Sequence, residues 1–136
     1  MYKNLKSLFL LLMLVMCFSI VNAQDDNKQR VDPLKTKVDK MPMFPGGTQA
    51  LLEYLKDNVN YPIDAEKKKK SGRVLVTFDV DTDGNVVDVE VVKSVWPSLD
   101  AEALRVVESM PKWSPGIKDG KAVRIRYTLP ITFRLK

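Results

Sequence analysis

The most prominent chemical pattern in this sequence is a set of acidic residues around a glycine, which matches the calcium loop of an EF-hand. The matching residues follow the spacing D-x-D-x-D-G-x5-E and are Asp79, Asp81, Asp83, Gly84 and Glu90. An EF-hand loop lies between two helices. The residues on either side here are rich in valine and alternate at period two, which is typical of strands. We therefore interpret the pattern as a polar hairpin turn, with a calcium site as the alternative.

No other set of residues indicates catalysis or metal binding. The chain has no histidine, and its one cysteine, Cys17, lies in the apolar N-terminal segment. These two facts exclude Ser-His and Cys-His nucleophile pairs and remove the commonest zinc ligands. We expect no catalytic residue, no metal and no cofactor, so the protein is not predicted to be an enzyme.

The N-terminal segment has the pattern of a secretory signal peptide. Lys3 and Lys6 are followed by an apolar run of 13 residues, 8–20, and by small residues that end at Ala23. A membrane-spanning helix needs about 20 residues. We expect cleavage after Ala23 and export to the periplasm, with an uncleaved anchor as the alternative. The net charge of +5 is too small to indicate nucleic-acid binding by an exported protein.

The remaining 113 residues divide into a linker and one domain. Residues 24–40 are polar, lack a hydrophobic period and are predicted to be a linker. The domain over 41–136 shows helical spacing or strand alternation in turn: helices at 48–59, 64–70 and 98–110, and strands at 73–80, 86–92 and 123–135. This order predicts an α+β fold, a small antiparallel sheet with two main helices packed on one face.

Two aromatic residues and one proline add detail to this prediction. Trp96 and Trp113 stand at the two ends of the 98–110 helix, and we expect them to pack in the core instead of anchoring a partner. Pro130 lies in the final strand and offers no N–H, so that strand should lie at an edge of the sheet. An exposed edge can accept a strand from another chain, or pair with a second copy to form a homodimer.

An ordered series of short motifs resembles the TonB C-terminal domain family. The resemblance covers about 41–136 and rests on a series that is specific as a set: Phe44-Pro45-Gly46-Gly47, Tyr61-Pro62, Gly72 to Val80, Asp83-Gly84-Asn85-Val86, Leu99 to Leu104, Met110 to Gly116, Asp119-Gly120-Lys121 and Leu129 to Phe133.

The resemblance implies a partner and a site. Members of the family bind periplasmic segments of outer-membrane receptors, and a short segment adds as a strand to the domain's sheet. Carried over to this sequence, the peptide-binding residues are Asn58, Asn60, Tyr61, Val123, Arg124, Ile125, Arg126, Tyr127, Thr128 and Leu129. Arg124 and Arg126 would select acidic or polar partners. The implied partner is a TonB-dependent receptor or another periplasmic protein.

The N-terminal part differs from that of a full-length transducer. Such proteins have a membrane anchor that engages inner-membrane motor proteins, and a long proline-rich stretch. The 17-residue linker here reaches about 60 Å at most when extended. A binding module is therefore our first prediction, and a membrane-anchored TonB energy transducer is the alternative.

Overall fold

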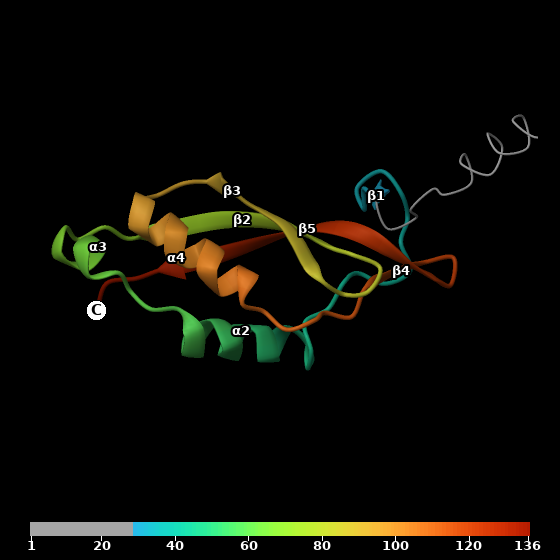
Figure 1. The fold of residues 1–136 in the computed structure, drawn as a ribbon, viewed down its shortest axis with the longest axis horizontal. Coiled ribbons are helices and arrows are strands. Elements are labelled where there is room, and N and C mark those ends of the chain that lie inside the picture. Colours follow the sequence, from blue (N-terminus) through green and yellow to red (C-terminus); the bar gives the residue numbers. More distant parts are fainter. Residues whose placement is uncertain (1–28) are drawn as a thin grey trace, which may run out of the picture.

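The fold is α+β, as predicted, with two long strands at its centre (Figure 1). The computed structural model of the chain describes residues 29–136, so the expected signal peptide lies outside the described residues. Within this range no helix has the length and apolar character that crossing a membrane requires. The elements are β1 Arg30–Val31, α2 Gly47–Asn58, α3 Ile63–Lys67, β2 Gly72–Val80, β3 Val86–Lys93, α4 Pro97–Glu108, β4 Gly116–Lys118 and β5 Lys121–Phe133.

The sheet has the strand order β1-β5-β2-β3, and β4 pairs with the start of β5. β2 and β5 pair antiparallel from Gly72↔Phe133 to Val80↔Ile125. β1, however, pairs with β5 in parallel, so the sheet is mixed and the predicted antiparallel sheet is corrected in this respect. A strand of two residues is too short to show an alternating pattern, so no pattern indicated β1 beforehand.

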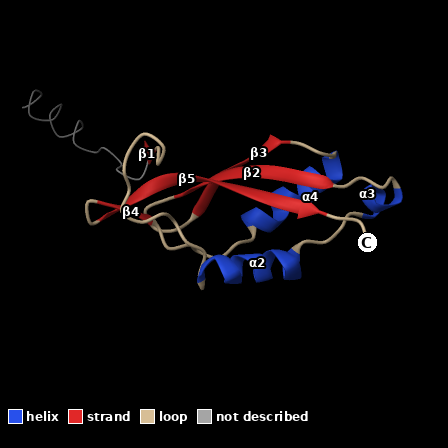
Figure 2. Cartoon of the chain, turned by 180° about the vertical axis from the view of Figure 1, so that it is seen from behind, coloured by secondary structure: helices blue, strands red, loops and turns tan. Residues whose placement is uncertain are grey.

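The helices cover one face of the sheet. Alternate residues of β2 and β5 point to this face and are buried, and they comprise Val74, Val76, Phe78, Val80, Ile125, Leu129, Ile131 and Phe133. From α4 the buried residues are Leu99, Ala103, Val106 and Val107. Helix α2 lies beside α4 (Figure 2), and the Tyr54 hydroxyl donates a hydrogen bond of 3.0 Å to the Val106 carbonyl. The predicted placement of two main helices on one face is thus confirmed.

Trp113 is the centre of an aromatic cluster that fixes residues 41–47, the entry segment that leads into α2, to the sheet. Its indole is 4% exposed and contacts Phe44, Phe78 and Tyr127, with ring centroids 5.1–5.8 Å away. The predicted packing role of Trp113 is confirmed. Trp96 is only half-buried, and its Nε1 donates to Asp64 at 3.2 Å.

The β2–β3 turn is attached to this cluster through Gly84. Gly84 has φ of 90°, and a Cβ at this position would lie 2.0 Å from the carbonyl oxygen of Trp113. The backbone N–H of Trp113 also donates to the Gly84 carbonyl at 2.8 Å. Glycine is therefore needed here for both the backbone conformation and the close approach.

Several residues predicted as linker belong to the folded part. Arg30 and Val31 form β1, and Lys40 forms an isolated bridge with Ile117 of β4. Between them the Asp32 carbonyl accepts from the N–H groups of two later residues in a tight turn. The polar composition of this segment was compatible with a linker, but its backbone pairs with β5 and β4. In Figure 1, β1 and β4 lie at one end of the molecule, and α3 and the C-terminus lie at the other.

Candidate functional site

The acidic residues of the calcium-like pattern are directed to different partners. Asp81 accepts hydrogen bonds from the backbone N–H groups of Asp83 and Asn85, at 2.9 and 2.8 Å, inside its own turn. Glu90 instead accepts from Arg126 at 2.8 Å. Strands precede and follow the turn, so the polar-hairpin interpretation is confirmed. In the part of the chain that the structure describes, no three His, Cys, Asp or Glu side chains are placed to hold a metal ion.

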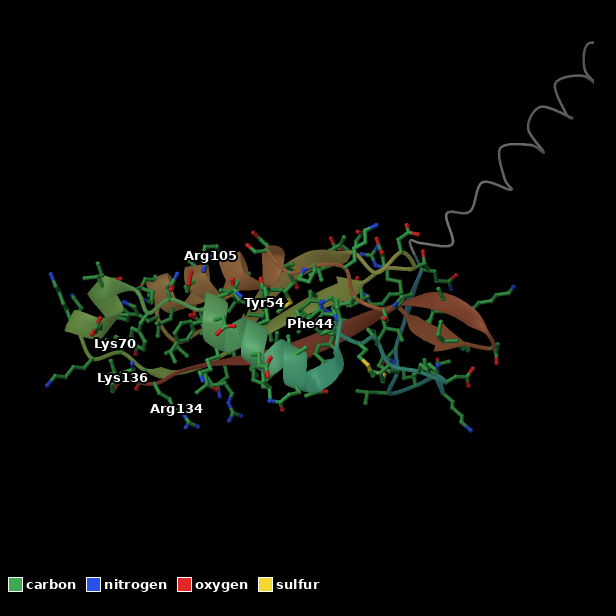
Figure 3. The ribbon with its side chains drawn as sticks, turned by 90° about the horizontal axis from the view of Figure 1, so that it is seen from below. Phe44, Tyr54, Lys70, Arg105, Arg134 and Lys136 are labelled. Carbon is green, nitrogen blue, oxygen red and sulfur yellow. The ribbon has the colours of Figure 1, made fainter. Side chains whose placement is uncertain are left out.

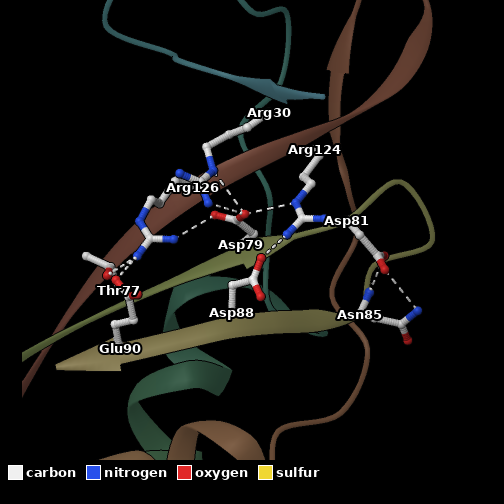
Figure 4. Close-up of polar contacts among 9 residues, drawn as sticks. All are labelled: Arg30, Thr77, Asp79, Asp81, Asn85, Asp88, Glu90, Arg124 and Arg126. Carbon is white, nitrogen blue, oxygen red and sulfur yellow. Dashed lines mark hydrogen bonds and ion pairs between the residues drawn. The ribbon is translucent and has the colours of Figure 1, made fainter. Parts of the chain in front are cut away.

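Asp79 lies at the centre of an ionic cluster on the face of the sheet away from the helices. Its side chain is fully buried, and three arginines donate to its carboxylate (Figure 4). Oδ2 accepts from Arg30 Nε and Nη2, at 3.0 and 2.8 Å, and from Arg124 Nε at 2.9 Å. Oδ1 accepts from Arg126 Nη1 at 3.1 Å. These contacts join β1, β2 and β5 through one carboxylate.

Two further carboxylates complete the cluster at its rim. Arg124 also donates to Asp88, and Arg126 donates to Glu90 at 2.8 Å. Three guanidinium groups therefore face three carboxylates, and the cluster is neutral. The Arg124 and Arg126 side chains are only 15% and 23% exposed. Their contacts are internal, which differs from the predicted selection of acidic partners. The strand register decides this, because it places Arg126 directly opposite Asp79.

The cluster predicts a specific loss of stability at acid pH. Burial raises the pKa of Asp79, but the hydrogen bonds from Arg30, Arg124 and Arg126 outweigh it and hold the pKa below its usual value of 3.8. A lowered pKa in the folded state gives stability that is complete above the unfolded pKa and is lost as the pH falls through the folded pKa. The urea concentration at the unfolding midpoint, measured from pH 6 to pH 2, should therefore decrease once the pH is below about 4. The decrease should be smaller in Asp79→Asn. An equal fall in both proteins would contradict this role of Asp79.

The outer edge of β5 is divided into a covered and an open part. Val123 pairs with Gly116 of β4, and Arg124 and Ile125 lie opposite β1. Among the described residues, no strand pairs with this side of β5 from Arg126 to Phe133. Pro130 lies within that open stretch, as its missing N–H predicted. The final strand is thus an edge strand over its C-terminal two thirds.

Two grooves follow the open edge between β5 and α2. The first, about 710 Å³, is lined by apolar residues of the entry segment and α2, by Trp113 and by Tyr127 of β5. The second, about 620 Å³, lies between the C-terminal end of α2 and the end of β5, and its lining includes Leu55, Val59, Asn60, Tyr61 and the 131–134 stretch. Figure 3 shows Phe44 near the start of α2 and Arg134 near the far end of the molecule. The first groove therefore borders the open edge at Tyr127, and the second borders it at 131–133.

The segment after α2 is held in place by α4. The backbone N–H of Asn60 donates to Glu102 at 2.9 Å, and Arg105 Nη2 donates to the Asn58 carbonyl at 2.8 Å. Burial raises the pKa of Glu102, and the bonds from Arg105 and Asn60 lower it by more, so the net shift is downward. The ring of Tyr61 packs edge-on against the ring of Phe133, with 5.8 Å between the ring centroids. One wall of the second groove is thus fixed against both α4 and β5.

The structure brings together only part of the predicted peptide-binding set. Asn60 and Tyr61 line the second groove, and Arg126, Tyr127, Thr128 and Leu129 lie on the open stretch. Asn58 points back to the Tyr54 carbonyl instead, and Val123, Arg124 and Ile125 lie on the covered part. The 131–133 end of the strand was not in the predicted set, although it lines the second groove. The continued alternation up to Phe133 was the signal that could have indicated it.

These features define a small α+β domain with an open strand edge beside two grooves. Residues 57–135 match the family model described as the Gram-negative bacterial TonB protein C-terminal. This chain belongs to the TonB C-terminal domain family. Domains of this family are not enzymes, in agreement with the prediction from the sequence.

A solved structure agrees with this assignment. The solution structure of Helicobacter pylori TonB-CTD, residues 179–285, is similar with a TM-score of 0.50 and 26% identity, over 65% of this chain and 79% of that one. A second structure of that domain, residues 194–285, has a TM-score of 0.48 and 28% identity, over 65% of this chain and 92% of that one. No curated protein matches the chain.

Proposed function

We propose that this chain binds an extended segment of a TonB-dependent outer-membrane receptor, or of another periplasmic protein, by adding it as a strand to β5. The observation that carries the proposal is the open edge from Arg126 to Phe133, with a groove of α2 and β5 residues at each end. In strand addition the main-chain hydrogen bonds supply affinity, and pockets for alternate side chains supply specificity.

Pro130 indicates which backbone groups would receive the segment. Within a strand, the N–H and C=O groups of successive residues point alternately to the two neighbours. Proline in a sheet has its nitrogen directed away from the ladder, here away from β2. Arg126, Thr128 and Thr132 share the orientation of Pro130 and would present their N–H and C=O groups to the open edge.

The grooves indicate the side chains that a bound segment would carry. Alternate residues of an added strand would point toward α2, where the grooves contain apolar side chains such as Met43, Leu51, Leu55 and Val59. Met43 is 55% exposed, so it is accessible to such a residue. We expect the preferred segments to have apolar residues at every second position.

Isotope-edited NMR of the exported protein tests this proposal. The probes are synthetic peptides from the periplasmic N-terminal segments of candidate outer-membrane receptors. The expected result is a set of saturable amide shifts at Arg126 to Phe133 and at Asn60 and Tyr61. A folded protein that shifts with no peptide, or shifts elsewhere only, would refute receptor binding at this edge. Concentration-dependent shifts of the same amides without peptide would indicate a homodimer instead.

Thr128→Pro should weaken binding of such a peptide about tenfold or more. The substitution removes one outward N–H and places a ring against the incoming strand, and a factor of ten corresponds to about 1.4 kcal/mol. The N–H of residue 128 points away from β2, so its loss removes no hydrogen bond of the β2–β5 ladder and the domain should stay folded. Thr128→Val keeps the N–H and should bind like the original protein in a fluorescence-anisotropy titration. Equal affinity of all three proteins would exclude pairing at this point of the strand.

The location and the N-terminus belong to the same proposal. Export to the periplasm with cleavage after Ala23 would give a freely diffusing binding domain, whereas retention of the segment would give an anchored energy transducer that also contacts inner-membrane motor proteins. Mass spectrometry of the protein from periplasmic and membrane fractions distinguishes these two forms. A terminus at Gln24 would exclude the anchored transducer.

A further inference from the structure

β1 occupies the position on β5 that directly continues the open edge. Arg30 and Val31 lie opposite Arg124 and Ile125, on the side of β5 that faces away from β2. The open stretch begins at the next residue, Arg126. A segment added along β5 would therefore meet β1 as soon as it extended toward the start of the strand.

The attachment of β1 is local and depends on one buried carboxylate. Arg30 donates through both Nε and Nη2 to Asp79 Oδ2, while its own side chain remains 45% exposed. The remaining attachment is the pairing of two residues with β5. So short a contact, with a partly exposed ion pair, is of the kind that opens at low free-energy cost.

We propose that β1 is an internal occupant of the strand-accepting edge, and that a partner segment displaces it and brings a basic residue into the place of Arg30. This inference rests on the proposed function for the identity of the partner. Only molecules with β1 released can bind the partner at this position, so the apparent association constant equals the intrinsic one multiplied by the released fraction. The parallel direction of β1 shows the orientation that this part of the edge accepts.

The charges of the cluster determine the chemistry of the incoming residue. With Arg30 in place, the three arginines balance Asp79, Asp88 and Glu90. Without it, the cluster has one excess negative charge, and fully buried Asp79 loses two hydrogen bonds. A lysine or arginine opposite Arg124 restores both, whereas an acidic residue there adds repulsion. We therefore expect partner segments to be basic at this position.

The first experiment uses the chain's own segment as the probe and needs no receptor. In the full chain, Arg30→Ala with Val31→Pro removes the ion pair and prevents β1 from pairing. A synthetic peptide of residues 26–34 is then titrated against this variant and against the original protein, and the amides of Arg124 and Ile125 are followed by NMR. The expected result is saturable shifts at these amides in the variant and at least about tenfold weaker binding to the original protein, corresponding to release in about one molecule in ten. The same peptide with Arg30→Gln should bind the variant more weakly than the unmodified peptide.

The second experiment tests competition with a receptor peptide. The double variant should bind a receptor peptide long enough to reach Arg124 about tenfold more tightly than the original protein. Arg73→Ala is the matched control, because Arg73 is exposed on β2 and lies outside the cluster. It should leave the affinity unchanged.

The outcomes separate this inference from the proposed function. If no receptor peptide binds but the 26–34 peptide binds the variant as described, the receptor is the wrong partner and β1 remains an occupant of the edge. If receptor peptides bind the original protein and the double variant equally, or the 26–34 peptide binds both proteins equally or neither, β1 is not an internal occupant. Equal binding of the peptides with arginine and glutamine would exclude the preference for a basic residue.

Discussion

Asp79→Asn is expected to lower the free energy of unfolding by about 3 kcal/mol, because it removes the one buried carboxylate on which three arginines converge. Asp79 is fully buried, and its two oxygens accept four hydrogen bonds from arginines of β1 and β5. Asparagine keeps the size of the side chain but has no charge, and its amide nitrogen is a donor that must face at least one donating guanidinium group. The loss should appear in urea denaturation at pH 7 as a lower midpoint with a similar slope.

Asp88→Asn provides the control for this prediction. Asp88 contacts Arg124 in the same cluster, but its side chain is 61% exposed. Exposed ion pairs contribute only about 0–1 kcal/mol, so the expected loss is below 1 kcal/mol. Losses of similar size in the two variants would show that the buried carboxylate has no special part in holding β2 and β5 together.

Trp113→Ala is expected to have the largest effect of any substitution considered for this protein, a loss of about 4 kcal/mol. The indole is buried at the point where the entry segment, β2 and β5 meet, and its removal would leave a cavity bordered by Phe44, Phe78 and Tyr127. The total stability of a domain of this size is about 5–15 kcal/mol, so the substitution removes a large part of it and the variant should unfold at a clearly lower temperature. Thermal unfolding followed by near-UV circular dichroism would measure the change.

Two further variants show whether packing is the cause. Trp113 Nε1 is buried and has no hydrogen-bond partner among the described residues. Trp113→Phe removes this unpaired donor while it keeps an aromatic ring, so it should cost clearly less than Trp113→Ala. Trp96→Ala should also cost less, since Trp96 is only half-buried. If Trp96→Ala were the more damaging change, the placement of the core around Trp113 would be wrong.

The elements that bury one regular face were predictable from the sequence. Valines and isoleucines at every second position indicated β2, β3 and β5, and the spacing of Leu99, Ala103, Val106 and Val107 indicated α4. The pair Asp119-Gly120 indicated the turn before β5, and both residues have the positive φ that such a turn requires. Local pattern was sufficient because each of these elements repeats its signal over several residues.

The candidate site was predictable only in part. Pro130 indicated an edge strand, and the family resemblance indicated Asn60, Tyr61 and the middle of β5. The short strands β1 and β4 had no such signal, so Val123, Arg124 and Ile125 were predicted to bind a peptide. In the structure β4 pairs with Val123, and β1 pairs with Arg124 and Ile125. The arginines of β5 were predicted to select a partner, because nothing in their spacing shows that the register sets them against Asp79.

The sequence by itself determined the α+β class, the main elements, the non-enzymatic character and the family of this protein, because alternation, turn residues and ordered motifs are local properties of the chain. Only the tertiary structure decided which part of β5 is open, that Asp79 binds three arginines, and that Arg30 and Val31 lie on the same edge. These features depend on contacts between residues distant in the sequence: Arg30 binds Asp79, 49 positions away, and pairs with Arg124, which is farther still. Such contacts are fixed by strand register and by the direction in which the chain returns to the sheet, and neither is encoded in a short stretch of residues.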